Sequence, residues 1–282
     1  MMLVSVNGIR LNVEESGSGA PLLLFHGFTG AASTWRDITS SWDGWRRIAV
    51  DLIGHGASDA PEDERRFTMD HCVADVVALL DELAIERATV LGYSMGGRVA
   101  LQLAAAAPER VAALVLEGAS PGMDDPAERA ARVASDRALA DDIECDGIEA
   151  FVDRWERVPI FATQARLSDD MRARQRCQRL ANRPIGLANS LRGMGAGAQT
   201  SLWPRLHELA MPALLIAGED DVKYSEMARA MASRMPDATV RVVPGAGHAA
   251  HLERPDVFSD HVKEFLTRCL SDHQKLASSP RP

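Results

Sequence analysis

Residues 88–97 carry the sequence ATVLGYSMGG, in which an apolar, partly β-branched run leads into a turn centred on a serine. The following residues, 98–107, are mostly alanine and leucine and favour a helix. A strand, a sharp turn and a helix in this order form a nucleophile elbow, which exposes the hydroxyl group of the central serine. Gly92 and Gly96, two residues before and after Ser94, permit the tight turn. The segment therefore predicts a sheet enzyme in which Ser94 acts as nucleophile or base.

Short apolar runs recur on both sides of this segment, and helical segments fall between most of them; the runs lie at 21–25, 47–50, 111–116, 213–217 and 239–243. The clearest helix has a single apolar stripe over 69–83 behind Thr68 as a possible cap. At the start of the chain, Asn7-Gly8 separates two alternating segments and predicts an antiparallel hairpin. Alternating strands and helices predict an α/β fold with a doubly wound, mostly parallel sheet, whose ligands bind at the carboxyl ends of the strands.

The alternation stops between residues 120 and 205, where the sequence is polar, rich in Ala and Arg and interrupted by Gly and Pro. We expect a helical cap here, inserted into a core formed by residues 1–119 and 206–270. The cap holds thirteen basic and thirteen acidic residues, so the net charge of −9 lies outside it and the cap is electropositive relative to its scaffold. Residues 271–282 are polar without an apolar period, and we predict a disordered tail.

The overall composition excludes several classes of function. A net charge of −9 argues against binding to nucleic acid or to an anionic membrane. The first fifteen residues contain neither a signal peptide nor a long apolar run, so we expect a cytoplasmic protein. No metal-ligand cluster or phosphate loop is present, so no metal or cofactor is expected, and the expected partner is a small-molecule substrate bound by a monomer or weak homo-oligomer. Reduced thiols are expected at four widely spaced positions, Cys72, Cys145, Cys177 and Cys269.

A catalytic serine needs a histidine, and the histidine needs a carboxylate that orients it. In sheets of this kind the order along the chain is serine, acid, histidine. The segment GEDD at 218–221 ends one strand, and GAGH at 245–248 ends the next. His248 is therefore the expected base, and either Asp220 or Asp221 is the expected acid.

A glycine-rich turn, HGFTG at 26–30, ends the first long parallel strand. Such a turn can direct backbone N–H groups at a developing oxyanion, and the expected donors are the amides of Phe28 and Met95. The histidines outside the triad have simpler explanations. His26 and His55 are expected to bond nearby loop backbone, and His251 is expected at the surface or just behind the site.

With these residues in place, the chain resembles the α/β-hydrolase superfamily over nearly its whole length. It resembles one branch more closely, the 2-succinyl-6-hydroxy-2,4-cyclohexadiene-1-carboxylate (SHCHC) synthases of menaquinone (vitamin K2) biosynthesis. The spacing in this family favours Asp221 as the acid. The matching segments are 25–30, 51–56, 92–100, 117–122, 135–137, 159–161 and 218–224.

The resemblance implies a lyase and not a hydrolase. Such an enzyme removes a proton from a cyclohexene ring and expels pyruvate from an enolpyruvyl ether, leaving a conjugated diene. Its substrate carries several carboxylates, which suit planar, bidentate arginines. The family's substrate-binding positions correspond here to Tyr93, Arg98, Arg132, Trp155, Phe161, Arg179 and Lys223.

In this interpretation His248 activates Ser94, the serine oxygen takes the ring proton, and Asp221 holds the imidazole tautomer. The main alternative is a serine esterase or carbon–carbon bond hydrolase of the same fold, and the triad alone does not distinguish the two. The pocket does, because lipophilic esters need apolar walls whereas converging cations predict a polyanionic substrate. A noncatalytic binding protein is a further alternative, but it has no need of a complete triad.

Overall fold

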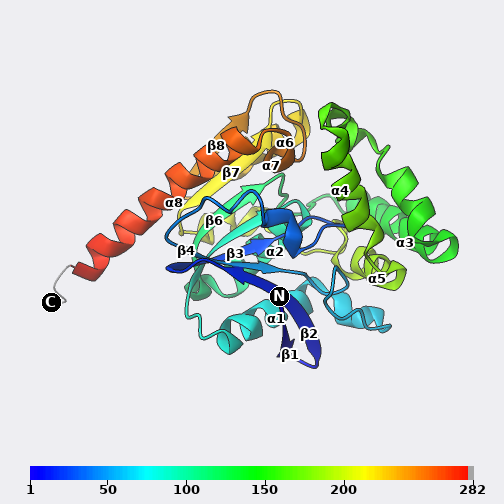
Figure 1. Ribbon diagram of the computed structural model, residues 1–282, viewed down its shortest axis with the longest axis horizontal. Helices are drawn as coiled ribbons and strands as arrows, with labels where there is room; N and C mark the ends of the chain where they lie inside the picture. The colour runs from blue at the N-terminus through cyan, green and yellow to red at the C-terminus, as the bar shows by residue number, and fades with distance from the viewer. Residues whose placement is uncertain (279–282) are drawn as a thin grey trace.

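The computed structural model describes residues 1–278 and contains an eight-stranded sheet in the order β1-β2-β4-β3-β5-β6-β7-β8 (Figure 1). β1 and β2 pair antiparallel, β2 pairs antiparallel with β4, and every later pairing is parallel. The predicted mostly parallel sheet is confirmed. The strands are β1 (Met2–Val6), β2 (Ile9–Ser16), β3 (Ala20–Phe25), β4 (Trp45–Val50), β5 (Ala88–Tyr93), β6 (Val111–Glu117), β7 (Ala213–Gly218) and β8 (Ala238–Val243).

The predicted local signals are confirmed at the start of the chain and at the first helix. Asn7 and Gly8 have φ of 44° and 84°, as the two central residues of the hairpin turn require. The side chain of Thr68 accepts a hydrogen bond from the backbone N–H of His71 and caps helix α1 (Met69–Glu82). Each of these local signals forms the predicted turn or cap with its nearest neighbours in sequence.

Helices cover both faces of the sheet. Helices α1, α2 (Met95–Ala106) and α6 (Val222–Ala232) pack on one face, where their apolar side chains join those of the strands in one core. The other face is covered by the segment containing Trp35 and Trp42 and by the long helix α8 (Pro255–Ser278). Burial of each large aliphatic side chain stabilises the fold by roughly 1.5–3 kcal/mol. The two cores hold the sheet rigid, and its strand ends can therefore position side chains accurately.

The segment between β6 and β7 forms helices that lie beside the carboxyl ends of the strands (Figure 1, green). Their bounds are α3 (Pro126–Trp155), α4 (Asp169–Leu180) and α5 (Pro184–Met194), with a short 3-10 helix, η4 (Pro159–Arg166), between α3 and α4. Gly147, with φ of 83°, kinks α3. A separate small core around Phe151 and Leu187 joins α3 to α5, and Phe28, in the loop after β3, packs against it. We refer to residues 120–205 as the cap.

Helix α8 corrects one expectation. We predicted that residues 271–282 have no regular structure, but α8 continues to Ser278. Residues 271–278 contain no Gly or Pro, the run QKLA at 274–277 consists of good helix formers, and extending an existing helix costs less than starting one. Residues 279–282 lie outside the described part of the chain. Within residues 1–278, every helix is too short or too polar to cross a membrane.

Candidate active site

The nucleophile elbow has the geometry that the sequence predicts. Ser94 lies between β5 and α2 with φ of 51° and ψ of −107°. Its backbone N–H donates to the carbonyl oxygen of Glu117 at 2.7 Å, which ties the turn to the neighbouring strand β6. A Cβ atom on Gly92 would lie 2.3 Å from the carbonyl oxygen of Gly96, so the tight turn requires glycine at this position.

Ser94, His248 and Asp221 form a continuous hydrogen-bonded chain. His248 Nε2 lies 3.1 Å from Ser94 Oγ, and His248 Nδ1 lies 2.7 Å from Asp221 Oδ2. The imidazole side chain is 3% exposed, so its tautomer is set by these two partners and not by water. The carboxylate of Asp221 accepts from Nδ1, which leaves Nε2 free to accept the serine proton.

The adjacent carboxylate, Asp220, bonds to the cap and not to His248. It forms an ion pair with Arg166 of the cap, with an Nη1–Oδ2 distance of 2.6 Å. Asp221 is also the N-cap residue of α6, where its Oδ1 accepts the backbone N–H of Tyr224 at 3.4 Å. In this geometry Asp221 alone of the two carboxylates bonds the histidine.

The predicted oxyanion donors, the amides of Phe28 and Met95, belong to the loop after β3 and to the first residue of α2. Met95 is the first residue of α2, where a backbone N–H has no partner within the helix. Among residues 1–278, no described hydrogen bond uses either amide. A Cβ atom on Gly27 would lie 2.6 Å from the ring of Tyr93, so glycine allows this loop to approach the elbow. Both amides are therefore available to a substrate oxygen.

The remaining histidines near the site are structural. His26 Nδ1 lies 2.8 Å from the carbonyl oxygen of Gly27, and its Nε2 accepts from Leu52 N. His55 Nδ1 lies 3.0 Å from the carbonyl oxygen of Ile53, and burial lowers its pKa to about 3. Both predictions are confirmed. Of the two positions expected for His251, the surface and the space just behind the site, the structure shows the second, because the side chain is fully buried against Glu117.

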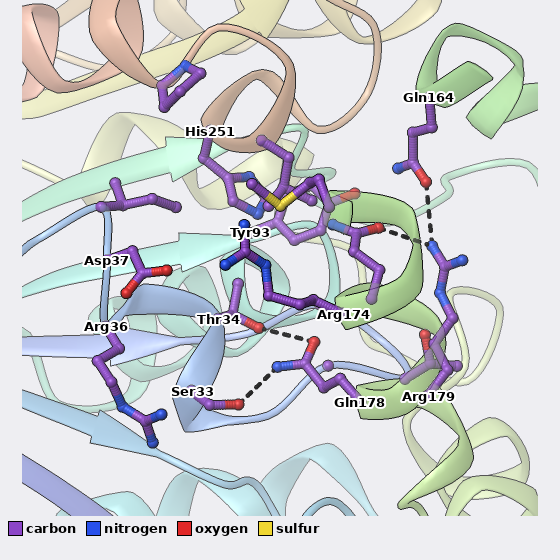
Figure 2. Close-up of a pocket in the computed structure, with 18 of the residues that line it drawn as sticks. Ser33, Thr34, Arg36, Asp37, Tyr93, Gln164, Arg174, Gln178, Arg179 and His251 are labelled. Atoms are coloured by element: carbon purple, nitrogen blue, oxygen red, sulfur yellow. Dashed lines mark hydrogen bonds between the residues drawn. The ribbon is translucent and has the colours of Figure 1, made fainter. Parts of the chain in front are cut away.

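A cavity of about 430 Å³ opens between the sheet and cap helix α4, next to the elbow (Figure 2). It contains four predicted site residues, Phe28, Tyr93, Phe161 and Arg179. Ser94 and His248 are not among its lining residues, so the cavity adjoins the triad instead of covering it. The polar side chains facing it include several that the sequence did not single out, namely Ser33, Thr34, Gln164, Arg174, Gln175 and Gln178.

Aromatic side chains form the wall between cap and triad. The ring centroid of Trp155 lies 5.4 Å from that of Phe28 and 5.5 Å from that of Phe161. Phe161 in turn lies 6.4 Å from His248. The Trp155 Nε1 is buried and has no hydrogen-bond partner among the described residues. Trp155 is thus both part of the cap core and a potential donor at the site.

Arg98 is a partly buried cation that bonds to no carboxylate among the described residues. Its Nη1 donates to the carbonyl oxygen of Met194 at 2.6 Å and to Gln199 Oε1 at 3.1 Å. Burial lowers the pKa of the guanidinium to about 10, so the group remains charged at neutral pH. The carbonyl of Met194 and the side-chain amide of Gln199 are uncharged groups of the cap, so they orient the cation without neutralising it. Arg98 can therefore attract an anionic ligand.

The other predicted cations, Arg179, Arg132 and Lys223, differ in exposure and in their bonded partners. Arg179 lines the cavity but pairs with Glu156 at 3.2 Å and lies 5.5 Å from the Phe161 ring centroid. Arg132 pairs with Asp136 at 2.8 Å, and its side chain is 44% exposed. Lys223 is exposed, with its Nζ 5.9 Å from the ring of Tyr224. The cavity therefore contains Arg179, whereas Arg132 and Lys223 are not among its lining residues.

Tyr224 and Arg174 were not predicted as individual site residues. The ring of Tyr224 lies 4.6 Å from His248, and burial raises the pKa of its phenol. Arg174 faces the cavity mouth in Figure 2 and pairs with Asp170 at 2.8 Å. Tyr224 lies within the matching segment 218–224, so its proximity to the acid was a usable signal. Arg174 is one of many cap arginines, and nothing in its sequence context distinguishes it.

Comparison with known proteins shows the fold family to which the chain belongs and the branch within that family. A family model described as the alpha/beta hydrolase fold matches residues 20–255, and the chain belongs to this family. A Bacillus subtilis (strain 168) protein provisionally named as an SHCHC synthase is 43% identical over 93% of this chain and 96% of its own. The SHCHC synthase of Serratia proteamaculans (strain 568) is 32% identical over 90% and 96%. Within the α/β-hydrolase fold, the chain belongs to the SHCHC synthase branch.

Solved structures give the same relationship. MenH from S. aureus superimposes with a TM-score of 0.87 at 33% identity, covering 92% of this chain and 98% of that one. A thermophilic esterase from Thermogutta terrifontis, solved with malate bound, superimposes with a TM-score of 0.85 at 27% identity, covering 95% and 99%. The fold alone therefore accommodates both a synthase and an esterase, and side chains at the site must distinguish them.

Proposed function

We propose that this protein is a carbon–oxygen lyase. It eliminates pyruvate from 2-succinyl-5-enolpyruvyl-6-hydroxy-3-cyclohexene-1-carboxylate and produces SHCHC for menaquinone biosynthesis. The observation that carries the proposal is Arg98, a partly buried guanidinium one helical turn after Ser94, to which no carboxylate of residues 1–278 is hydrogen-bonded. Membership of the SHCHC synthase branch supports the same conclusion.

The triad performs the proton transfer. His248 Nε2 accepts the Ser94 proton, and the serine oxygen removes a proton from the ring. The electron pair of the broken C–H bond at C2 forms a C2–C3 double bond, the pair of the C3–C4 double bond moves to C4–C5, and the C5–O bond to the enolpyruvyl group breaks. The departing group leaves as the enolate, which takes up a proton at its methylene carbon and becomes pyruvate. Asp221 stabilises the imidazolium during the transfer.

The charges around the site suit a substrate with several carboxylates. The amides of Phe28 and Met95 hold the substrate oxygen on which negative charge accumulates. Arg98 binds one carboxylate, and Arg179 binds a second within the cavity, where the aromatic wall excludes water. Arg132 and Lys223 act at longer range, because both are partly or largely exposed. The proposed substrate class is thus a polyanionic cyclohexene.

Release of pyruvate from the authentic enolpyruvyl substrate tests this proposal. Lactate dehydrogenase and NADH convert released pyruvate to lactate, and the fall in NADH absorbance gives the rate. We expect turnover on the order of 1–10³ s⁻¹, typical of enzymes acting on their own substrates. Turnover no faster than the uncatalysed elimination would exclude the lyase function.

The esterase alternative rests on the apolar residues of the cavity and on the esterase neighbour. An esterase would form an acyl intermediate on Ser94, which produces a burst of product in the first turnover. We expect only slow hydrolysis of p-nitrophenyl acetate and butyrate, without a burst. Fast hydrolysis with a stoichiometric burst, together with no release of pyruvate, would favour the esterase.

A further inference from the structure

A second carboxylate–histidine pair lies behind the triad. The side chains of Glu117 and His251 are both 0% exposed, and His251 Nδ1 lies 3.0 Å from Glu117 Oε1 and 2.8 Å from Oε2. The backbone N–H of His251 also donates to Oε1 at 3.0 Å. A buried carboxylate is expensive to desolvate unless such donors compensate it. The pair is therefore a fixed point in the core, and the proposed reaction does not use it.

Glu117 connects the two segments that carry the reacting groups. It is the last residue of β6 and pairs in register with Tyr93 of β5 and Ile216 of β7. Its carbonyl oxygen accepts the N–H of Ser94, while its carboxylate binds His251, three residues after His248. One residue thus fixes the serine through its main chain and the histidine segment through its side chain.

The ring of Tyr93 fills the space between the two histidines. Its centroid lies 4.6 Å from that of His251 and 5.4 Å from that of His248. On its other side, His251 packs against Trp35 at 5.1 Å. A rotation of the His251 ring would displace Tyr93 and, through it, His248. The position of the base therefore depends on the bond that holds His251.

We propose that Glu117 and His251 are positioning residues that set the distance and angle between Ser94 Oγ and His248 Nε2. The proposal rests on the triad of the proposed function. Loss of the pair lowers the reactivity of Ser94 without removing any member of the triad. Misplacement of a reacting group by about 1 Å can lower the rate about 10²-fold, because proton transfer requires the two heavy atoms within hydrogen-bond reach.

The substitution Glu117→Gln tests this, because it keeps the shape and the main-chain bond to Ser94 and removes the charge. The readout is the rate at which a fluorophosphonate labels Ser94, with kcat and KM for pyruvate release measured alongside. We expect labelling and kcat to fall about tenfold or more, with KM within about twofold. Labelling needs an activated serine but no elimination, so failure of the lyase proposal would leave this test intact.

Asp75→Asn is the matched control. Asp75 is likewise a buried carboxylate, bonded to Arg66 at 2.6 Å and to Asn7 at 3.0 Å, but it lies on α1, away from the elbow. We expect this variant to lose thermal stability while labelling stays within about twofold of wild type. Wild-type labelling by Glu117→Gln, or an equal loss in Asp75→Asn, would overturn the proposal.

A pair of variants at His251 keeps the test possible if Glu117→Gln does not fold. His251→Asn retains a side-chain N–H donor near the Nδ1 position, whereas His251→Ala has none. We expect Ser94 in the alanine variant to be labelled at least about fivefold more slowly than in the asparagine variant. Equal rates in the two variants would overturn the proposal.

Discussion

The strand ends and the cap contribute differently to the site. At the strand ends, Ser94, His248 and Asp221 bond to one another over 3.1 and 2.7 Å, and each is positioned by the strand or turn that carries it. In the cap, most arginines bond to acidic residues of the cap itself. Such pairs include Arg132–Asp136, Arg154–Asp146, Arg174–Asp170, Arg176–Asp153, Arg179–Glu156 and Arg192–Asp141.

This difference assigns the reacting groups to the strand ends and leaves substrate recognition to a few side chains around them. The hydrogen bonds of the triad form without a ligand, so the strand ends that carry these residues determine its reactivity. The equal numbers of acidic and basic residues in the cap appear in the structure as ion pairs, so an excess of cap charge is not what attracts the substrate. In the proposed function, attraction of the substrate depends on cations to which no carboxylate of the described chain is bonded, above all Arg98.

The largest effect is expected from the triad. Ser94→Ala removes the proposed base and leaves the surrounding cations in place. Pyruvate release should fall about 10³-fold or more, within the upper range for a lost general base, while substrate affinity changes little. Single-turnover kinetics and equilibrium binding measure the two quantities separately. A variant that retains a tenth of wild-type turnover would exclude Ser94 as the base.

Arg98→Met should have the next largest effect. A charge-assisted hydrogen bond contributes about 1.5–3 kcal/mol, so kcat/KM should fall roughly 10- to 100-fold, mainly through KM. Removing a partly buried cation that pairs with no carboxylate should not lower the free energy of unfolding by a similar amount. Urea unfolding checks this second point. Unchanged KM would mean that Arg98 only supports the cap through Met194 and Gln199.

The difference between the strand ends and the cap also explains which features the sequence could predict. The strands, the hairpin at Asn7-Gly8 and the elbow each have a sequence signal within a few residues, and the structure confirms all of them. The choice of Asp221 over Asp220 needed the family spacing, and the structure gives a reason, because Arg166 takes Asp220. The sequence could not place this arginine, since the contact joins residues far apart in the chain.

The sequence was least informative about side chains buried behind the site or facing it from the cap. His251 was expected at the surface or just behind the site, and its burial depends on Glu117, a partner 134 residues away. Arg174 and Gln178 face the cavity, but thirteen basic residues in the cap offer similar local contexts. Helical periodicity gives the face of a helix on which a residue lies. It does not give the partner that this face meets.

Arg179→Gln should have a smaller effect than Arg98→Met, because Arg179 already shares Glu156 with Arg176. We expect KM to rise about tenfold, the loss of one charged hydrogen bond to substrate. Arg176→Gln is the matched control, since Arg176 lies one turn earlier on the same helix, bonds the same carboxylate and does not line the cavity. Its KM should stay near the wild-type value. Equal effects in the two variants would mean that Glu156, and not the cavity cation, determines affinity.

The smallest effect is expected from pH on the buried histidines of the core. Burial lowers the pKa of His55 to about 3, so below pH 6.5 the unfolded chain binds a proton at this residue that the native protein does not. The free energy of unfolding should therefore decrease as the pH falls. From pH 7.5 to 6.0 the contribution of one such histidine is about 0.8 kcal/mol.

His55→Asn keeps a possible donor to Ile53 and removes the titration, so its free energy of unfolding should decrease less over this interval. Urea unfolding at the two pH values measures the difference, and equal decreases in variant and wild type would show that His55 does not contribute to acid sensitivity.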